Sequence, residues 1–188
     1  AILTQSTAWT NVEKAMKKLE IAGVLSLDGI HQTPVEKLAE LVHSSGYFNV
    51  KARKLKAMAQ HIYDHHGGDL SAMLGQPWEA LRTELLSVYG IGEETADDIV
   101  LYAASAPSFV SDAYTKRIVD RLGITPKQDR YENYRALFMG ALPANVSIFN
   151  EYHALIVKLG KDICKKSKPL CQECPLIEIC ITGAAEAS

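Results

Sequence analysis

Hydrophobic residues recur every three or four positions along most of this chain, which is the period of a helix with one buried face. Between residues 11 and 22, for example, Val12, Ala15 and Leu19 fall on one side. No stretch combines strict apolar–polar alternation with the β-branched residues typical of strands. The pattern therefore predicts an all-α protein without a sheet.

Proline, glycine and capping residues mark where these helices begin and end. Thr33 precedes Pro34 at the start of one helix, and Gly67-Gly68 ends another that begins near Val50. Further helices are predicted over residues 78–88, 93–104, 113–122, 130–142 and 147–163, with only short turns over 70–74.

Composition adds limits to this picture. A chain of 188 residues with 47% hydrophobic residues can form one compact unit or two small lobes. No apolar run approaches the length of a membrane span, and nothing resembles a signal peptide. The net charge of −2 does not indicate a nucleic-acid partner, but the positive residues gather in three clusters, which favours one. These clusters are Lys51, Arg53, Lys54 and Lys56; Lys116, Arg117 and Arg121; and Lys161, Lys165, Lys166 and Lys168.

A short loop between two predicted helices contains Gly90, Ile91 and Gly92. Glycine permits positive φ and a close approach to the backbone, and the N–H groups that begin the next helix attract an anion. Ile91 is expected to anchor the loop in the core. The order of helix, Gly-Ile-Gly and helix is the helix–hairpin–helix pattern, for which a phosphate of nucleic acid is the natural ligand.

All four cysteines lie in the last quarter of the chain, at positions 164, 171, 174 and 180. Disulfides are disfavoured because a core of this size needs no covalent staples. Zinc sites usually pair two short knuckles, whereas here Cys171 and Cys174 form a single one. The wider outer spacing favours a [4Fe–4S] cluster over zinc, without excluding zinc.

The hairpin, the segment from Val110 to Arg117 and the cysteine run together resemble the endonuclease III branch of the helix–hairpin–helix DNA glycosylases. The segment from Ser45 to Lys54 is most similar to relatives that act as 3-methyladenine DNA glycosylases. The resemblance covers nearly the whole chain. It implies a two-lobed all-α fold, with a helical bundle over residues 1–105, its hairpin at about 85–104, and a lobe over residues 106–188 that holds the cluster. The active site is then expected in the cleft between the lobes. A further helix before residue 1 is expected by the same resemblance.

Asp112 is the catalytic residue that this resemblance implies. A fixed carboxylate stabilises the positive charge that develops on deoxyribose when an N-glycosidic bond breaks. Aspartate at a helix start is also an ordinary N-cap, so residue type alone does not decide its role. Gln5 is expected to fill the gap left by the flipped nucleotide, and Tyr47 and Tyr114 to line the base pocket, although either tyrosine could simply pack in the core.

The same resemblance assigns the cofactors and the DNA contacts. Cys164, Cys171, Cys174 and Cys180 are expected to hold a [4Fe–4S] cluster. A monovalent cation at the hairpin, bound by the carbonyls of Leu86, Val88 and Ile91, is a second candidate. The residues expected to contact DNA are Gln5, Leu86, Val88, Gly90, Ile91, Gly92, Thr95, Lys165, Lys166 and Lys168.

Glu94 stands where the strand-cleaving members of this family have a lysine. A carboxylate cannot form the Schiff base that starts strand cleavage. The sequence therefore predicts a monofunctional glycosylase that removes alkylated purines such as 3-methyladenine. The alternatives are an endonuclease III-like enzyme for oxidised pyrimidines or mismatched thymine or uracil, and a non-catalytic DNA-binding or redox module. We expect a cytoplasmic, nucleoid-associated monomer that acts on double-stranded DNA with a damaged base and contacts no membrane.

Overall fold

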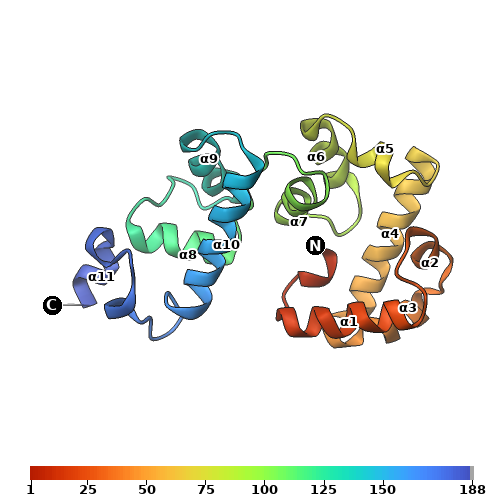
Figure 1. Ribbon diagram of the computed structural model, residues 1–188, viewed down its shortest axis with the longest axis horizontal. Coiled ribbons are helices and arrows are strands. Elements are labelled where there is room, and N and C mark those ends of the chain that lie inside the picture. The colour runs from red at the N-terminus through yellow and green to blue at the C-terminus, as the bar shows by residue number, and fades with distance from the viewer. Residues whose placement is uncertain (187–188) are drawn as a thin grey trace. The chain divides into compact units, whose positions relative to one another are not determined.

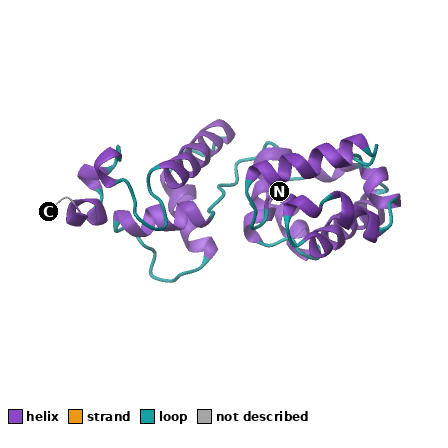
Figure 2. Cartoon of the chain, turned by 90° about the horizontal axis from the view of Figure 1, so that it is seen from below, coloured by secondary structure: helices purple, strands orange, loops and turns teal. Residues whose placement is uncertain are grey.

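The computed structural model describes residues 1–186, and every regular element within them is a helix, with no strand (Figures 1 and 2). This confirms the all-α prediction. The chain divides into two compact units, the first from Ala1 to Ile99 and the second from Val100 onward. The predicted boundary, after residue 105, lies a few residues beyond the observed boundary, which follows Ile99.

The first unit contains seven α-helices and two 3₁₀ turns. In chain order they are η1 (Ile2–Thr4), α1 (Trp9–Ile21), α2 (Leu27–Gln32), α3 (Val35–Leu41), η2 (His43–Ser45), α4 (Phe48–His66), α5 (Leu70–Leu74), α6 (Trp78–Ser87) and α7 (Glu93–Asp98). The predicted apolar face of α1 is buried: Val12, Ala15 and Leu19 join Leu38, Val42 and Ala52 in one core cluster. This core supports η1 and α4, from which several candidate site residues extend.

The second unit is built around two helices that pack on each other, α8 (Ala113–Leu122) and α10 (Val146–Asp162). Its other elements are α9 (Tyr131–Ala141), the 3₁₀ turns η4 (Cys171–Glu173) and η5 (Ile177–Ile179), and α11 (Ile181–Glu186). Phe109 stacks on Phe138 at 4.1 Å between ring centroids and meets the edge of Phe149 at 5.7 Å. These contacts fix the extended segment that leads to Asp112.

Three local features differ from the predictions. Helix α2 was not predicted, because Gly29 weakens the helical pattern; a Cβ at this position would lie 2.6 Å from the carbonyl oxygen of Val24. Residues 70–74 form a helix where only turns were predicted, capped by Asp69. The helix predicted over 93–104 is α-helical only to Asp98 and continues as the π-helix η3 (Ile99–Ala103). Neither periodicity nor composition distinguishes such a π-helical turn from an α-helix.

No helix within residues 1–186 is both long enough and apolar enough to cross a membrane.

Candidate functional site

Asp112 is the N-cap of α8, as its position after an extended segment predicts. Its Oδ1 accepts hydrogen bonds from the backbone N–H of Thr115 at 2.8 Å and from the Thr115 hydroxyl at 3.0 Å. Phe109 and Val110, which are fully buried, anchor the segment in front of it. The capping bonds and the buried segment before Asp112 thus fix the carboxylate at the start of α8. Oδ2 takes no part in the capping bonds.

His153 on α10 faces Oδ2. Its Nε2 lies 3.7 Å from that oxygen, which is an ion-pair distance and longer than a hydrogen bond. The hydroxyl of Tyr102 on η3 lies 2.5 Å from the other ring nitrogen, Nδ1. A phenol that donates to Nδ1 leaves the imidazole proton on Nε2, which points toward the carboxylate. The sequence alone does not indicate this group, because His153 lies on α10, far along the chain from Tyr102 and Asp112.

These neighbours keep Asp112 ionised. Its side chain is only 16% exposed, and burial alone raises the pKa of a carboxyl group. The proximity of His153 and the two bonds from Thr115 outweigh burial, so the pKa of Asp112 is lowered from its ordinary value of 3.8. The site therefore holds a negative charge, largely out of water, across the neutral pH range.

The hairpin in the first unit depends on two glycines for different reasons. Gly90 has a φ of +83°, and a Cβ there would lie 2.3 Å from the Lys54 side chain, so both conformation and space require glycine. Gly92 has a φ of −97° and no atom within 4 Å of a Cβ, so the expected positive φ is absent there. Its missing side chain instead leaves the N-terminus of α7 open. Ile91 is buried as predicted.

An ion pair holds the two hairpin helices together. Arg82 on α6 donates from Nε and Nη2 to the two carboxylate oxygens of Asp97 on α7, at 2.8 and 3.0 Å. Asp97 is completely buried, and Arg82 is 16% exposed. Because this bidentate geometry fixes both helices, it also fixes the glycine loop between them.

Gln5 is bonded to the hairpin. Its Nε2 donates to the carbonyl of Gly90 at 3.2 Å and to the hydroxyl of Thr95 at 2.8 Å, and its Oε1 accepts from Lys54 Nζ at 2.5 Å. Thr95, predicted as a DNA contact, is buried and serves here as a partner of Gln5. The structure thus brings Gln5, Gly90 and Thr95 together within one unit.

Two further residues near Gln5 differ in exposure. Lys51 was grouped with a basic surface cluster, but it is buried and donates to the carbonyls of Leu3 and Ser45, at 2.9 and 2.6 Å. Burial and then Lys54 lower its pKa. Tyr47 is 73% exposed in a left-handed conformation, and it lines a recess with Gln5 and Lys54. Lys51 therefore stabilises η1, whereas the exposed side chain of Tyr47 is accessible to a ligand.

Tyr114 belongs to α8 in the second unit, where it packs against α10. A Cβ at Gly160 would come within 2.5 Å of its ring, and the Arg117 guanidinium lies 5.1 Å from the ring centroid. These contacts match the ordinary packing that the sequence left open for this residue. Nothing in them requires a base.

The four cysteines line one cavity in the second unit and form no disulfide with one another. Within residues 1–186, no three of their sulfur atoms lie within 4.8 Å of one another, which is wide for a single zinc ion with bonds of about 2.3 Å. Arg121 Nη1 donates to Cys164 Sγ at 3.1 Å, and the N–H of Gly183 donates to Cys180 Sγ at 3.3 Å. A wide set of half-buried, hydrogen-bonded sulfurs fits a [4Fe–4S] cluster.

The two arginines of the second basic cluster stabilise the cysteine loop. Arg117 donates to the carbonyls of Cys164 and Gly160, at 2.9 and 2.7 Å. Arg121 donates to the carbonyls of Lys165 and Lys166, at 2.8 and 3.1 Å. The side chains of Lys165, Lys166 and Lys168 remain exposed. The arginines thus shape a loop that presents lysines to solvent.

Comparison with known proteins identifies relatives over nearly the whole chain. The model of the HhH-GPD superfamily base excision DNA repair proteins matches residues 1–144. A proposed DNA repair glycosylase of Methanocaldococcus jannaschii is 42% identical over 183 residues, which are 97% of this chain and 83% of that protein.

Two solved structures share the fold. A trapped endonuclease III–DNA covalent intermediate matches with a TM-score of 0.85 and 24% identity, over 100% of this chain and 83% of that one. The H. pylori 3-methyladenine DNA glycosylase MagIII, bound to 1,N6-ethenoadenine, matches with a TM-score of 0.72 and 26% identity, over 85% and 81%.

Proposed function

Because this chain belongs to the HhH-GPD superfamily of base excision DNA repair proteins and is a DNA N-glycosylase, we propose that it removes alkylated purines from double-stranded DNA without cutting the strand. The observation that carries the proposal is a retained, ionised Asp112 combined with Glu94 at the position of the lyase lysine. The likeness to MagIII, a 3-methyladenine DNA glycosylase, supports the choice of substrate class.

Asp112 acts through Oδ2, the carboxylate oxygen that takes no part in capping the helix. When the bond between C1′ and the purine nitrogen breaks, its electrons leave with the base, and positive charge develops on the sugar. Oδ2 stabilises this charge, and water then attacks C1′ and gives up a proton to the carboxylate or to solvent. An alkylated purine is already cationic, so it departs as a neutral base and needs little acid catalysis.

Lys116 is the amine nearest to Asp112 along α8, and its environment makes it a poor nucleophile. Its Nζ lies 2.8 Å from Asp129, 3.1 Å from Asp120 and 2.8 Å from the Tyr134 hydroxyl. The bonds to Asp129 and Tyr134 raise the pKa of Lys116 well above its usual range. A protonated amine cannot attack C1′, which supports the monofunctional assignment.

DNA binding is assigned to the open N-terminus of α7 and to the lysines of the cysteine loop. Backbone N–H groups at Gly92 and beyond would hold a phosphate. Gln5 would release its bonds to Gly90 and Thr95 to occupy the gap in the duplex. The exposed carboxylates of Glu93 and Glu94 oppose a phosphate at that site, which increases the need for the lysines or a bridging cation. Cys164, Cys171, Cys174 and Cys180 would hold a [4Fe–4S] cluster, which ties the loop into a rigid frame. The protein is expected to act as a monomer.

A panel of duplexes, each with one lesion, tests the proposal. After incubation with the protein, half of each sample is treated with alkali and half is not. We expect 3-methyladenine or a related alkylated purine to yield abasic sites that break only with alkali. Strand breaks without alkali, or a protein–DNA adduct trapped by borohydride, would contradict the monofunctional assignment. Excision confined to oxidised pyrimidines or mismatched thymine would favour the endonuclease III-like alternative.

A further inference from the structure

Two histidines and a glutamate meet in the first unit, outside the hairpin loop. His61 Nε2 lies 2.7 Å and His66 Nε2 lies 2.6 Å from the same oxygen of Glu84, Oε1. His61 and His66 belong to α4, and Glu84 belongs to α6. Within residues 1–186, this is the set of three metal-ligating side chains whose ligand atoms all lie within 4.8 Å of one another.

The neighbours of Glu84 direct it toward the histidines. Gln76 Nε2 donates to its second oxygen, Oε2, at 2.7 Å, and also to the Met73 carbonyl at 3.1 Å. Gln76 therefore fixes the plane of the carboxylate and leaves Oε1 to the two rings. An outer hydrogen bond of this kind is what orients a carboxylate ligand in metal sites.

The three groups are also sheltered from solvent. Their side chains are only 12%, 15% and 19% exposed. Two imidazoles and a carboxylate supply the nitrogen and oxygen donors that divalent transition metals bind in proteins.

We propose that His61, His66 and Glu84 form a binding site for a divalent transition metal, with zinc as the ion that fits best. Two imidazole nitrogens and one carboxylate oxygen, completed by water, are a known ligand set for tetrahedral zinc. With bonds of about 2.0–2.1 Å, the ligand atoms would sit about 3.3 Å apart. The nitrogens need to withdraw from Oε1 by less than about 1 Å to admit the ion. Each neutral ring would then carry its proton on Nδ1.

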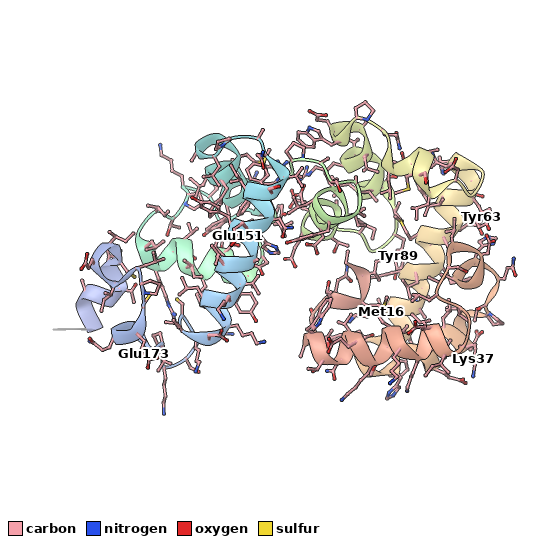
Figure 3. The ribbon with its side chains drawn as sticks, in the orientation of Figure 1. Met16, Lys37, Tyr63, Tyr89, Glu151 and Glu173 are labelled. Atoms are coloured by element: carbon pink, nitrogen blue, oxygen red, sulfur yellow. The ribbon has the colours of Figure 1, made fainter. Side chains whose placement is uncertain are left out.

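Such an ion would join the C-terminal end of α4 to α6, the helix that leads into the hairpin. Tyr63, labelled in Figure 3, lies between the two histidines on α4 and marks this end of the helix. The ion would stabilise the first unit and play no part in base removal. It is independent of the proposed function and of the cysteine site, which lies in the second unit.

Zinc titration of the full chain tests the proposal. The protein is purified without oxygen, so that metal on the cysteines stays in place, and loosely bound ions are removed with a mild chelator. Zinc chloride is then titrated by calorimetry, and thermal unfolding is followed with and without zinc. We expect uptake of one zinc ion per chain and a higher melting temperature with zinc.

Matched variants locate the ion. His66→Ala and Glu84→Gln should each weaken zinc binding at least about tenfold and remove the shift in melting temperature. Glu79→Gln is the control, because Glu79 is an exposed carboxylate on α6, the same helix as Glu84. The far-ultraviolet circular dichroism of each variant in metal-free buffer verifies the fold, and His61→Ala replaces a variant that misfolds. Equal binding by the wild type and both site variants, or no zinc uptake by the wild type, would overturn the proposal.

Discussion

At the scale of single residues, the two carboxylate oxygens of Asp112 have different surroundings. Oδ1 closes the first turn of α8 through Thr115, whereas Oδ2 lies near His153 and takes no part in the capping bonds. In the proposed mechanism, the same fixed carboxylate that caps the helix also holds a charge for the sugar. Structure and chemistry can be separated here, because capping needs an acceptor and base removal needs an anion.

Asp112→Asn should separate these tasks. Asparagine is as good an N-cap as aspartate, so the free energy of unfolding should change by less than about 1 kcal/mol. The loss of charge should lower the rate of base removal by at least about 100-fold, because no anion faces the developing cation. Single-turnover excision measures the rate, and binding to a lesion duplex should be retained. A variant with near wild-type excision would show that another residue supplies the charge.

His153→Gln should move the pH dependence of excision. In the wild type, the pKa of Asp112 lies below its ordinary value of 3.8, so this group should not limit the rate near neutral pH. Without the histidine, only the bonds from Thr115 oppose the effect of burial, so the pKa of Asp112 rises from its wild-type value. The acid limb of kcat against pH should therefore shift upward, with little change in KM.

The lowered pKa of Asp112 also makes the stability of the folded protein depend on pH. Because the pKa of Asp112 is lower in the folded chain, its stabilising contribution is present above 3.8 and is lost as pH falls through the folded value. In the His153→Gln variant this contribution should already decline at higher pH. An unchanged acid limb in the excision profile would mean that His153 does not set the charge of Asp112.

At the scale of elements, the hairpin is held from two sides. Arg82 and Asp97 fix α6 against α7, and Gln5 and Lys54 fix the loop from η1 and α4. Each bond limits how far the loop can move in the free protein. For the proposed phosphate site, a loop that is already ordered loses less entropy on association.

Gly92→Asp should weaken DNA binding without unfolding the protein. The space around Gly92 is open, and its φ of −97° suits any residue, so the new side chain should fit. Its charge would repel phosphate, and affinity should fall by a similar factor for all duplexes, because phosphate contacts do not read sequence. Fluorescence anisotropy with lesion and undamaged duplexes measures this.

Two alanine variants serve as controls for the hairpin. Gly92→Ala should be nearly neutral in stability, whereas Gly90→Ala should cost about 1–2 kcal/mol, because φ there is +83° and the Lys54 side chain is in the way. A loss of affinity in Gly92→Asp that is confined to one lesion would indicate a role in the base pocket instead.

Much of the fold and part of the site follow from local pattern. Helical periodicity predicts most of the helices, and the glycine hairpin and the Asp112 cap are visible as short motifs. His153 could not be predicted, since its approach to Asp112 depends on how α10 packs on α8. Lys51 belongs to a basic cluster in the sequence, and its burial could not be predicted because lysine is rarely buried. Only the fold supplies the carbonyls of Leu3 and Ser45 to which it donates. The identities of the catalytic and DNA-binding residues remain predictions.

At the scale of the whole molecule, DNA binding must overcome a net charge of −2. Several positive side chains form intramolecular contacts: Lys51 with backbone carbonyls, Lys116 with two aspartates, and Arg117 and Arg121 with the cysteine loop. Lys165, Lys166 and Lys168 are exposed and lie close together in sequence. Affinity for the DNA backbone should therefore depend on this loop more than on total charge.

Neutralising Lys165, Lys166 and Lys168 together should flatten the salt dependence of DNA binding. Each lost phosphate contact should reduce the slope of log K against log salt by about 0.9. The reduction should be the same for lesion and undamaged duplexes, measured from low to moderate ionic strength. Neutralising Lys14, Lys17 and Lys18 on the exposed side of α1 provides a control with the same change in charge. An equal reduction in both variants would show that net charge, and not the cysteine loop, sets the affinity.

The catalytic role proposed for the Asp112 carboxylate, added to its role as a helix cap, also bears on how variants of this chain should be screened. Asparagine, serine and threonine all cap helices well, so each could replace Asp112 with little loss of heat resistance. A library selected only for folding or solubility would therefore keep these replacements and record them as harmless, although none supplies the anion. For this protein, tolerance of substitution at position 112 in a stability screen is no guide to which clones still repair DNA.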